Sequence, residues 1–228
     1  MRDRRLANRP IFFDHDPSRG IVDHGRRSVV PERLLDAILN RHYNPRFQLC
    51  NELINHDLSR PQNGYEKLVY AGHAIETLWM VLDEAVRRKD TKRFDRAAAL
   101  FRRHCEVAKD RVFGGLLRNL RDVDSNDWTT DKTLFPHQEA LIGALLMIDQ
   151  TGDPWARDFY REIDEYTRTH FPMKDIGSPL WQVIGDRQVT RTPDMQRAEN
   201  YHHARFLMLN LLASERLIQR NGKPARWT

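Results

Sequence analysis

Residues 134–148 have the sequence LFPHQEALIGALLMI, in which Glu139 is the only formally charged residue. A helix on the surface of a globular protein carries its apolar residues on one stripe and its charged residues on the opposite face. This stretch has no such polar face. It is therefore predicted to form a helix that is buried on nearly all sides, in a protein of the all-α class.

Helices of this kind alternate along the chain with strongly charged ones. Residues 66–89 and 201–213 are also poor in charge, whereas residues 91–112 and the segment after Asp153 combine many charges with a single apolar stripe. Asp153 suits the N-cap of its helix, and Pro154 suits the first turn. The alternation predicts helical hairpins stacked side by side, with the charge-poor helices inside and the charged ones facing water.

Two further features complete the predicted fold. A shorter helix begins near Pro31 and carries apolar residues at helical spacing. Short polar stretches at 47–55 and 181–192 are predicted to form small hairpins at one rim, the second turning at Gly185 and Asp186. The expected organisation is a basic segment (1–30), a helical-hairpin domain (31–222) and a short tail (223–228).

Each inner helix brings ionisable side chains into its first turns. A buried carboxylate or imidazole costs several kcal/mol unless it is partnered or neutral. We therefore expect a polar pocket at one end of the helices, and the alternative is a set of satisfied core hydrogen bonds. The groups are His73 and Glu76 in the first helix, His137 and Glu139 in the second, and His202 and Arg205 in the third.

The sequence also contains other histidines and a possible set of metal ligands. His203 projects about 100° away from His202 on a helix and is not expected to share its role, and the role of His137 is left undecided. His73-x-x-Glu76, with Glu139 and His202, could supply metal ligands, but this spacing is common by chance and no HExxH motif accompanies it. No metal and no cofactor are predicted. Six histidines lie in charged or loop contexts and are predicted to be surface residues: His15, His24, His42, His56, His104 and His170.

The composition places limits on the class of protein. The 228 residues are 40% hydrophobic and 30% charged, which is ordinary for a globular protein. The net charge of +5 comes from basic residues that mostly alternate with acidic ones, so nucleic acid is not an expected partner. Neither a membrane span nor a signal peptide is evident, and Cys50 and Cys105 form no CxxC motif. A cytoplasmic protein is expected.

Three segments, in order and in spacing, resemble the N-acylglucosamine 2-epimerase and cellobiose 2-epimerase family. GHAIETLW (72–79) matches the family pattern G-H-x-I-E-x-x-W. KTLFPHQEAL (132–141) is similar to K-x-W-W-x-Q-A-E-A-L, and YHHAR (201–205) resembles Y-H-x-x-R. The resemblance runs roughly from Pro31 to Gln219 and implies the carboxyl-terminal half of an (α/α)6 toroid, about three of its six helical hairpins.

The resemblance also implies an activity, namely epimerisation at C2 of a reducing sugar or aldose–ketose isomerisation, through an enediolate. His73 and His202 would be the two catalytic proton-transfer groups, since an unperturbed imidazole pKa of about 6.5 suits both acid and base. The residues expected to bind substrate are Glu76, Trp79, Phe135, Glu139, Trp181 and Arg205.

Two departures from the family pattern leave the identity of the sugar open. Leu134 and Phe135 replace a tryptophan pair, and His137-Gln138 replaces Gln-Ala. A third departure, the half-length chain, leaves a rival interpretation open, because half a toroid exposes its end helices. The chain could therefore form a homo-oligomer or pair with a missing amino-terminal half. The alternative to catalysis is a non-catalytic or truncated fragment that acts as an interaction or dimerisation module.

Overall fold

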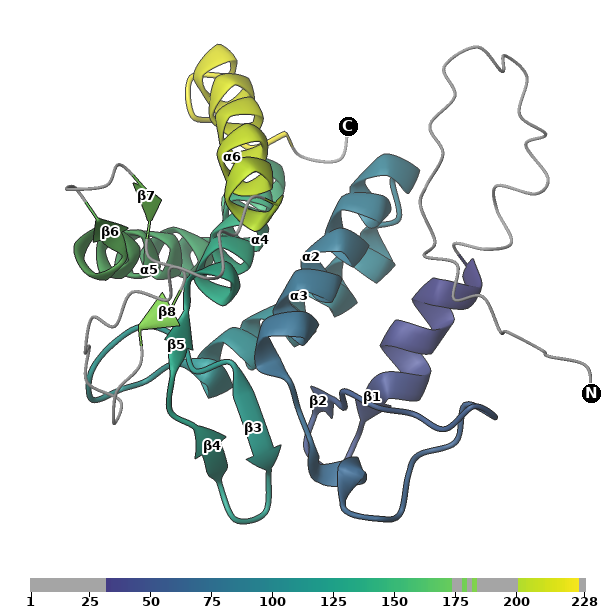
Figure 1. Ribbon diagram of the computed structural model, residues 1–228. Helices are drawn as coiled ribbons and strands as arrows, with labels where there is room; N and C mark the ends of the chain where they lie inside the picture. The colour runs from purple at the N-terminus through teal and green to yellow at the C-terminus, as the bar shows by residue number, and fades with distance from the viewer. Residues whose placement is uncertain (1–31, 174–177, 180–181, 184–200, 226–228) are drawn as a thin grey trace, which may run out of the picture. The chain divides into compact units, whose positions relative to one another are not determined.

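The computed structural model describes residues 32–173, 178–179, 182–183 and 201–225 (Figure 1). The chain divides into two compact units, Met1–Leu34 and Leu35–Thr228, and the description below concerns the second. The fold is all-α with short hairpins, as predicted. Its elements are η1 (Ala37–His42), β1 (Tyr43–Asn44), β2 (Leu49–Cys50), η2 (Tyr65–Lys67), α2 (Ala71–Arg88), α3 (Thr91–Ala108), β3 (Asn119–Asp122), β4 (Asp127–Thr129), β5 (Lys132–Thr133), α4 (Leu134–Thr151), α5 (Pro154–His170), β6 (Pro172–Met173), β7 (Ser178–Pro179), β8 (Gln182–Val183) and α6 (Tyr201–Gln219).

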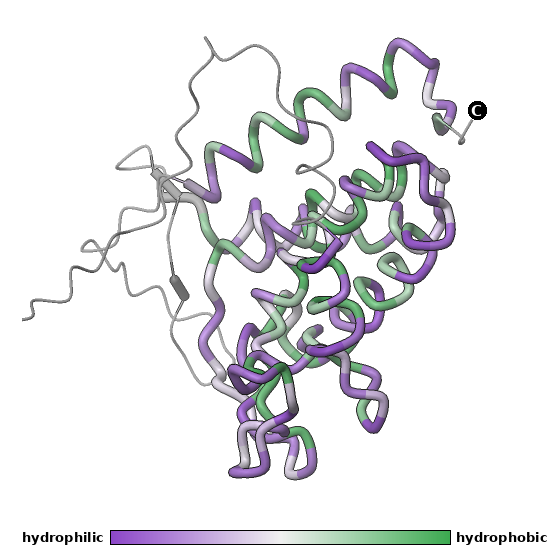
Figure 2. The backbone as a smooth tube through the Cα atoms, turned by 90° about the vertical axis from the view of Figure 1, so that its right-hand side faces the viewer, coloured by the Kyte–Doolittle hydropathy of each residue, from purple (hydrophilic) through white to green (hydrophobic). Residues whose placement is uncertain are grey.

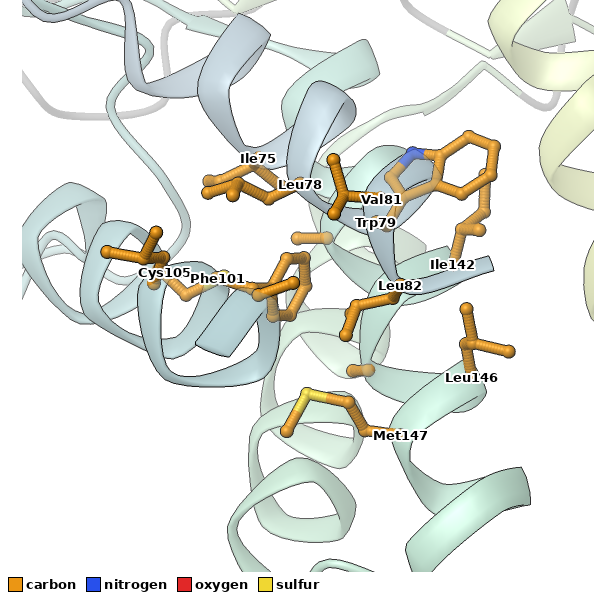
Figure 3. Close-up of a cluster of buried hydrophobic side chains, with 14 of the residues drawn as sticks. Ile75, Leu78, Trp79, Val81, Leu82, Phe101, Cys105, Ile142, Leu146 and Met147 are labelled. Atoms are coloured by element: carbon orange, nitrogen blue, oxygen red, sulfur yellow. The ribbon is translucent and has the colours of Figure 1, made fainter. Parts of the chain in front are cut away.

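Helix α4 is the central element, and it packs against α2, α5 and α6. Only Ile148 and Thr151 among its residues are not buried, which confirms the prediction from residues 134–148. Figure 3 shows side chains of α2, α3 and α4 converging on one apolar cluster, including Leu82, Phe101 and Met147. Burial of these side chains supplies most of the driving force that positions the helices.

The outer helices α3 and α5 bury one stripe each, as their sequences predict. Asp90 caps α3 by accepting a hydrogen bond from the backbone N–H of Arg93. Asp153 caps α5 by accepting from the N–H groups of the first turn, and Pro154 occupies that turn. Residues 66–89 contain two elements rather than one helix, because Gly64 (φ 94°) starts the short η2 and α2 begins only at Ala71.

The rim carries short antiparallel hairpins. Strands β1 and β2 pair through Tyr43↔Cys50 and Asn44↔Leu49, so the first predicted hairpin exists but begins earlier than residue 47. Strand β8 pairs with β5, through Lys132↔Val183 and Thr133↔Gln182. The predicted turn at 185–186 lies outside the described residues. The β3–β4 hairpin and the β6–β7 pair were not anticipated from the sequence.

Helix α6 departs from the prediction for residues 201–213. It was expected to be buried on nearly all sides, yet Ala213 is its only buried residue, and Leu207, Met208 and Leu211 are 52%, 56% and 61% exposed. Its main partner among the described residues is α4, which covers one side only. Apolar segments alternate with polar ones along α6 in Figure 2, where the helix ends near the carboxyl terminus. An apolar sequence predicts burial only where a neighbouring helix exists to provide it.

The prediction that His104 lies on the surface was wrong. Its side chain is fully buried, with Nδ1 donating to the carbonyl of Leu100 (2.8 Å) and Nε2 accepting from the N–H of Cys50 (2.9 Å). Burial lowers the pKa of His104 to about 4. The flanking arginines suggested exposure, but they lie on other faces of α3. His56 is exposed, His42 and His170 are half-buried, and His15 and His24 lie outside the described residues.

His137, whose role the sequence left undecided, repeats the arrangement of His104. Its Nδ1 donates to the carbonyl of Thr133 (2.8 Å), and its Nε2 accepts from the N–H of Leu116 (2.9 Å). Burial lowers the pKa of His137 to about 3. Both imidazoles are therefore neutral connectors between a helix and a rim loop.

None of the helices in the described part of the chain combines the length and the apolar character needed to cross a membrane.

Candidate functional site

The beginnings of α2, α4 and α6 meet, as the distribution of ionisable residues predicts. Glu76 from α2, Glu139 from α4 and His202 from α6 place one polar atom each within 4.8 Å of one another. Helix packing brings them together although Glu139 follows Glu76 by 63 residues and His202 follows Glu76 by 126 residues. Glu139 is fully buried, and the other two are partly exposed.

Both oxygens of Glu139 have partners. Oε1 accepts from His202 Nδ1 at 2.8 Å and from Arg205 Nη2 at 2.6 Å, while Oε2 accepts from the indole Nε1 of Trp79 at 2.5 Å. A buried carboxylate requires such a set of donors, because loss of its hydration is costly. Trp79 itself is 7% exposed, so its indole N–H is committed to Glu139.

Arg205 joins the two glutamates. Its Nη2 lies 2.5 Å from Glu76 Oε1 and 2.6 Å from Glu139 Oε1, and Nη1 donates to the hydroxyl of Tyr201. Burial disfavours the charged guanidinium, but the hydrogen bonds to Glu139 and Glu76 outweigh this effect and raise the pKa of Arg205. Arg205 is thus a permanent cation inside the cluster.

The position of Arg205 bears on the metal alternative. Glu76, Glu139 and His202 could together hold a metal ion by their spacing. However, the guanidinium of Arg205 already contacts the Oε1 atoms of both glutamates. This internal cation supplies positive charge beside both carboxylates.

His73 lies on α2 with its side chain 50% exposed. Its Nδ1 is 2.9 Å from Glu52 Oε1, and its ring stacks on Tyr70 with centroids 4.0 Å apart and planes inclined by 15°. The hydrogen bond to Glu52 raises the pKa of His73, while partial burial opposes this shift. Because a carboxylate only accepts hydrogen bonds, Nδ1 carries the proton.

The ring of Phe135 lies close to both histidines. Its ring centroid is 6.0 Å from that of His73 and 4.9 Å from that of His202. One aromatic ring therefore neighbours both imidazoles, although these come from helices α2 and α6, which are far apart in the sequence.

A cavity of about 320 Å³ opens beside this group. It is large enough for a small polar ligand, and it mixes carboxylate, imidazole and amide groups with apolar ones. The lining residues that matter for the chemistry are His42, Asn51, Glu52, His73, Glu76 and Thr77.

The sequence did not single out several residues that complete the site. Glu52 follows the β1–β2 hairpin, and no local motif marks it. Tyr70 supports the His73 ring and hydrogen-bonds to Arg118, which in turn pairs with Asp131 at 2.6 Å. Of these residues, only Tyr70 could have been predicted to contact His73, because it lies three residues earlier and so about one helical turn away. Trp181, expected to contact substrate, lies outside the described residues.

Comparison with known proteins identifies the family. A family model for N-acylglucosamine 2-epimerase (GlcNAc 2-epimerase) matches residues 30–205. The N-acylglucosamine 2-epimerase of Bos taurus is 29% identical to this chain over 130 residues, which cover 53% of the chain and 30% of the bovine protein.

Solved structures show the same fold. Cellobiose 2-epimerase from Bacillus thermoamylovorans aligns with a TM-score of 0.67 at 19% identity, covering 85% of this chain and 48% of that protein. A D-mannose isomerase aligns with a TM-score of 0.68 at 16% identity, covering 81% and 47%. The chain spans about half the length of these (α/α)6 toroids and 30% of the bovine relative. The chain belongs to the N-acylglucosamine 2-epimerase family.

Proposed function

We propose that this chain carries the proton-transfer centre of a carbohydrate 2-epimerase or aldose–ketose isomerase acting on a reducing sugar. The observation that supports it is the arrangement of His73 and His202. Both lie near the ring of Phe135, and each binds a carboxylate through Nδ1. Solved structures with the same fold include a cellobiose 2-epimerase and a D-mannose isomerase.

The chemistry follows from two imidazole side chains, a group that serves as both general acid and general base in proton transfer. In the open-chain sugar, one imidazole removes the proton from C2, and the electron pair moves toward the C1 carbonyl to give an enediolate. The other imidazolium then delivers a proton to the opposite face of C2, which yields the epimer. Delivery to C1 instead, with transfer of the O2 hydroxyl proton to O1, yields the ketose. No electrons leave the substrate, so the proposed reaction needs no redox cofactor.

The remaining site residues have supporting roles in this proposal. Glu139 orients His202, and Arg205 balances the charge of Glu76 and Glu139. Phe135 supplies an apolar surface for the sugar ring, and Trp79 holds Glu139 in place through its indole N–H. Part of Glu76 is accessible from the cavity, where it can accept a hydrogen bond from a sugar hydroxyl.

The test is incorporation of deuterium from heavy water at C2 of glucose, mannose, N-acetylglucosamine and cellobiose, followed by NMR. We expect exchange with at least one of them, and its loss in His73→Gln and His202→Gln. His56→Gln, at an exposed loop position, is the matched control and should retain full exchange. A fully active His202→Gln protein would remove that residue from the mechanism.

A second proposal concerns association through α6. Five large apolar residues of this helix are between 44% and 74% exposed, which exceeds what a monomer commonly leaves open: Leu207, Met208, Leu211, Leu212 and Ile218. We propose that this face packs against further barrel helices, supplied by a second copy of the chain or by a separate half. The same surface would serve a non-catalytic interaction module. Light scattering with mass analysis of the complex distinguishes a homo-oligomer from a complex with another chain.

We further propose a cytoplasmic location, which the cysteines support. Cys50 and Cys105 are both free and buried. Burial raises the pKa of Cys50 to about 12 and raises that of Cys105 well above the ordinary range, so neither is a thiolate at neutral pH. Free thiols are typical of reducing compartments. Fractionation of cells that express the protein checks this location.

A further inference from the structure

Several hydrogen bonds made by Asn51 and by the Glu52 backbone fix the chain around Glu52. Asn51, 3% exposed, donates from its amide to the carbonyls of Glu66 (2.8 Å) and Leu68 (3.1 Å) and accepts from the amide of Asn44 (2.9 Å). The N–H of Glu52 itself donates to Leu68. These bonds join the β1–β2 hairpin to the segment that leads into α2. The backbone that carries the Glu52 carboxylate is therefore held in one position.

That carboxylate meets an imidazole whose plane is also fixed. His73 stacks on Tyr70, and the hydroxyl of Tyr70 is hydrogen-bonded to Arg118, which is anchored by Asp131. Glu52 Oε1 then takes the proton on Nδ1 at 2.9 Å. Within the described residues Nε2 of His73 has no hydrogen-bond partner. Contacts on the ring face and on one edge leave the other edge, with Nε2, available to a ligand.

We infer that Glu52 is the positioning residue of His73: it holds Nδ1–H and thereby assigns proton transfer to Nε2. The catalytic consequence rests on the proposed function. The arrangement parallels the pair formed by Glu139 and His202, which is also joined through Nδ1. The two pairs differ in burial, because Glu139 is fully buried and Glu52 is 27% exposed. Each base would thus have its own carboxylate, from a different part of the fold.

The charged and titratable groups around His73 determine the sign of the effect. Glu52 and Glu76 favour the imidazolium, Arg118 and partial burial oppose it, and the net result is a raised pKa. Across the cavity lie His42 and Cys50, the latter a neutral thiol. Removing the charge of Glu52 therefore lowers the pKa of His73 and makes it a weaker base.

The experiment compares Glu52→Gln, Glu52→Ala and the control Glu165→Gln, an exposed position on the outer helix α5. Nitrogen NMR of labelled histidine, with the His73 signal assigned through His73→Gln, gives its tautomer and titration. We expect Nδ1–H in the wild type, a lower pKa in both Glu52 variants, and a mixture of tautomers in Glu52→Ala. Glutamine keeps an acceptor oxygen, so it should preserve the tautomer but not the pKa.

Kinetics supply the second measurement. We expect kcat to fall about 10-fold in Glu52→Gln and about 100-fold in Glu52→Ala, below the full contribution of a general base. The KM should change little, and the acidic limb of the pH profile should move to lower pH. Partial rescue by glutamine relative to alanine separates positioning from a general loss of folding.

The two proposals fail in different ways. An unchanged pKa and tautomer of His73 in both Glu52 variants would overturn the positioning role, even in an active enzyme. If no sugar shows exchange but the His73 signal shifts as expected, the proposed activity fails while the role of Glu52 in holding Nδ1 stands.

Discussion

Gly72 packs so closely on Phe135 that a Cβ atom placed there would lie 3.0 Å from Cζ of the phenyl ring. The same atom would lie 3.1 Å from Cγ of Pro136. The Phe135 ring, which lies near both histidines, can approach α2 because the residue before His73 has no side chain. This close approach gives the glycine of the first motif a physical role.

We predict that Gly72→Ala impairs function more than stability. Alanine favours an α-helix over glycine by about 1 kcal/mol, which offsets part of the crowding. The ring of Phe135 must nevertheless move by a few tenths of an ångström, which disturbs its contacts with His73 and His202. Sugar exchange should fall at least 10-fold while the melting temperature changes little. Equal activity of the variant and the wild type would contradict the argument.

Gly143→Ala is the contrasting substitution, because its main contact is a ring of the apolar core. Its Cβ would lie 2.3 Å from Cε2 of Phe101, a ring enclosed by the apolar cluster, and 3.0 Å from Cβ of Trp79, so the prediction concerns stability and not exchange. Overpacking of this kind typically costs 1–3 kcal/mol. Urea unfolding should show a loss of about that size. A variant as stable as the wild type would mean that α3 and α4 separate more easily than their packing indicates.

Trp79→Phe tests the support of Glu139. The substitution keeps an aromatic ring but removes the N–H that Oε2 of Glu139 accepts at 2.5 Å. A buried acceptor left without its donor costs about 1–3 kcal/mol, and Glu139 is then free to rotate away from His202. We expect lower unfolding free energy and weaker exchange.

The matched control is Trp155→Phe, which removes a similar bond from Trp155 to Glu106 (2.7 Å) on the outer helices. It should leave exchange unchanged. Similar losses of activity in both variants would show that the effect of Trp79→Phe is general instability.

Leu211→Glu tests the exposed face of α6. Leu211 is 61% exposed and lies among other apolar residues, so a carboxylate there should disrupt association without disturbing the packing on α4. We expect a smaller mass by light scattering and unchanged circular dichroism. Val112→Glu, equally exposed in the turn after α3, is the control and should keep the wild-type mass. An unchanged mass for Leu211→Glu would remove this face as an interface.

The buried His104 predicts a pH dependence of stability. Its folded pKa of about 4 lies below the unfolded value of 6.5, so below pH 6.5 the unfolded chain binds a proton that the folded protein does not. Stability should therefore fall from pH 6.5 down to about 4, by up to about 1.4 kcal/mol per pH unit for this group. Urea unfolding at several pH values measures the slope. His104→Gln should reduce it, and an identical slope would show that His104 is not the source.

Local sequence patterns predicted much of the fold because they depend on local physics. Glu139 as a lone charge among apolar residues identified α4, and Asp153 with Pro154 located the start of α5. The pairing of β8 with β5 could not be read in the same way, since it joins residues about 50 positions apart. The prediction that α6 is buried was wrong, because burial depends on a neighbouring element that the sequence of α6 does not encode.

The site shows the same division. His73, Glu76, Glu139 and His202 could be named because an ionisable residue in an apolar helix is conspicuous. Glu52 could not, since it is one of many acidic residues in polar loops and only the β1–β2 hairpin brings it to His73. His104 was misjudged because its neighbours in sequence are arginines, whereas its neighbours in space are the backbones of Leu100 and Cys50.

The one-sided attachment of α6 has a consequence for how the molecule opens. Amide hydrogens in α4 are enclosed on all sides and should exchange with solvent only when the whole domain unfolds. Those in α6, which rests mainly on α4, should exchange through local opening at much lower free energy. Because α6 carries His202 and Arg205, detachment of a single helix would dismantle the cluster around Glu139 while the rest of the fold persists.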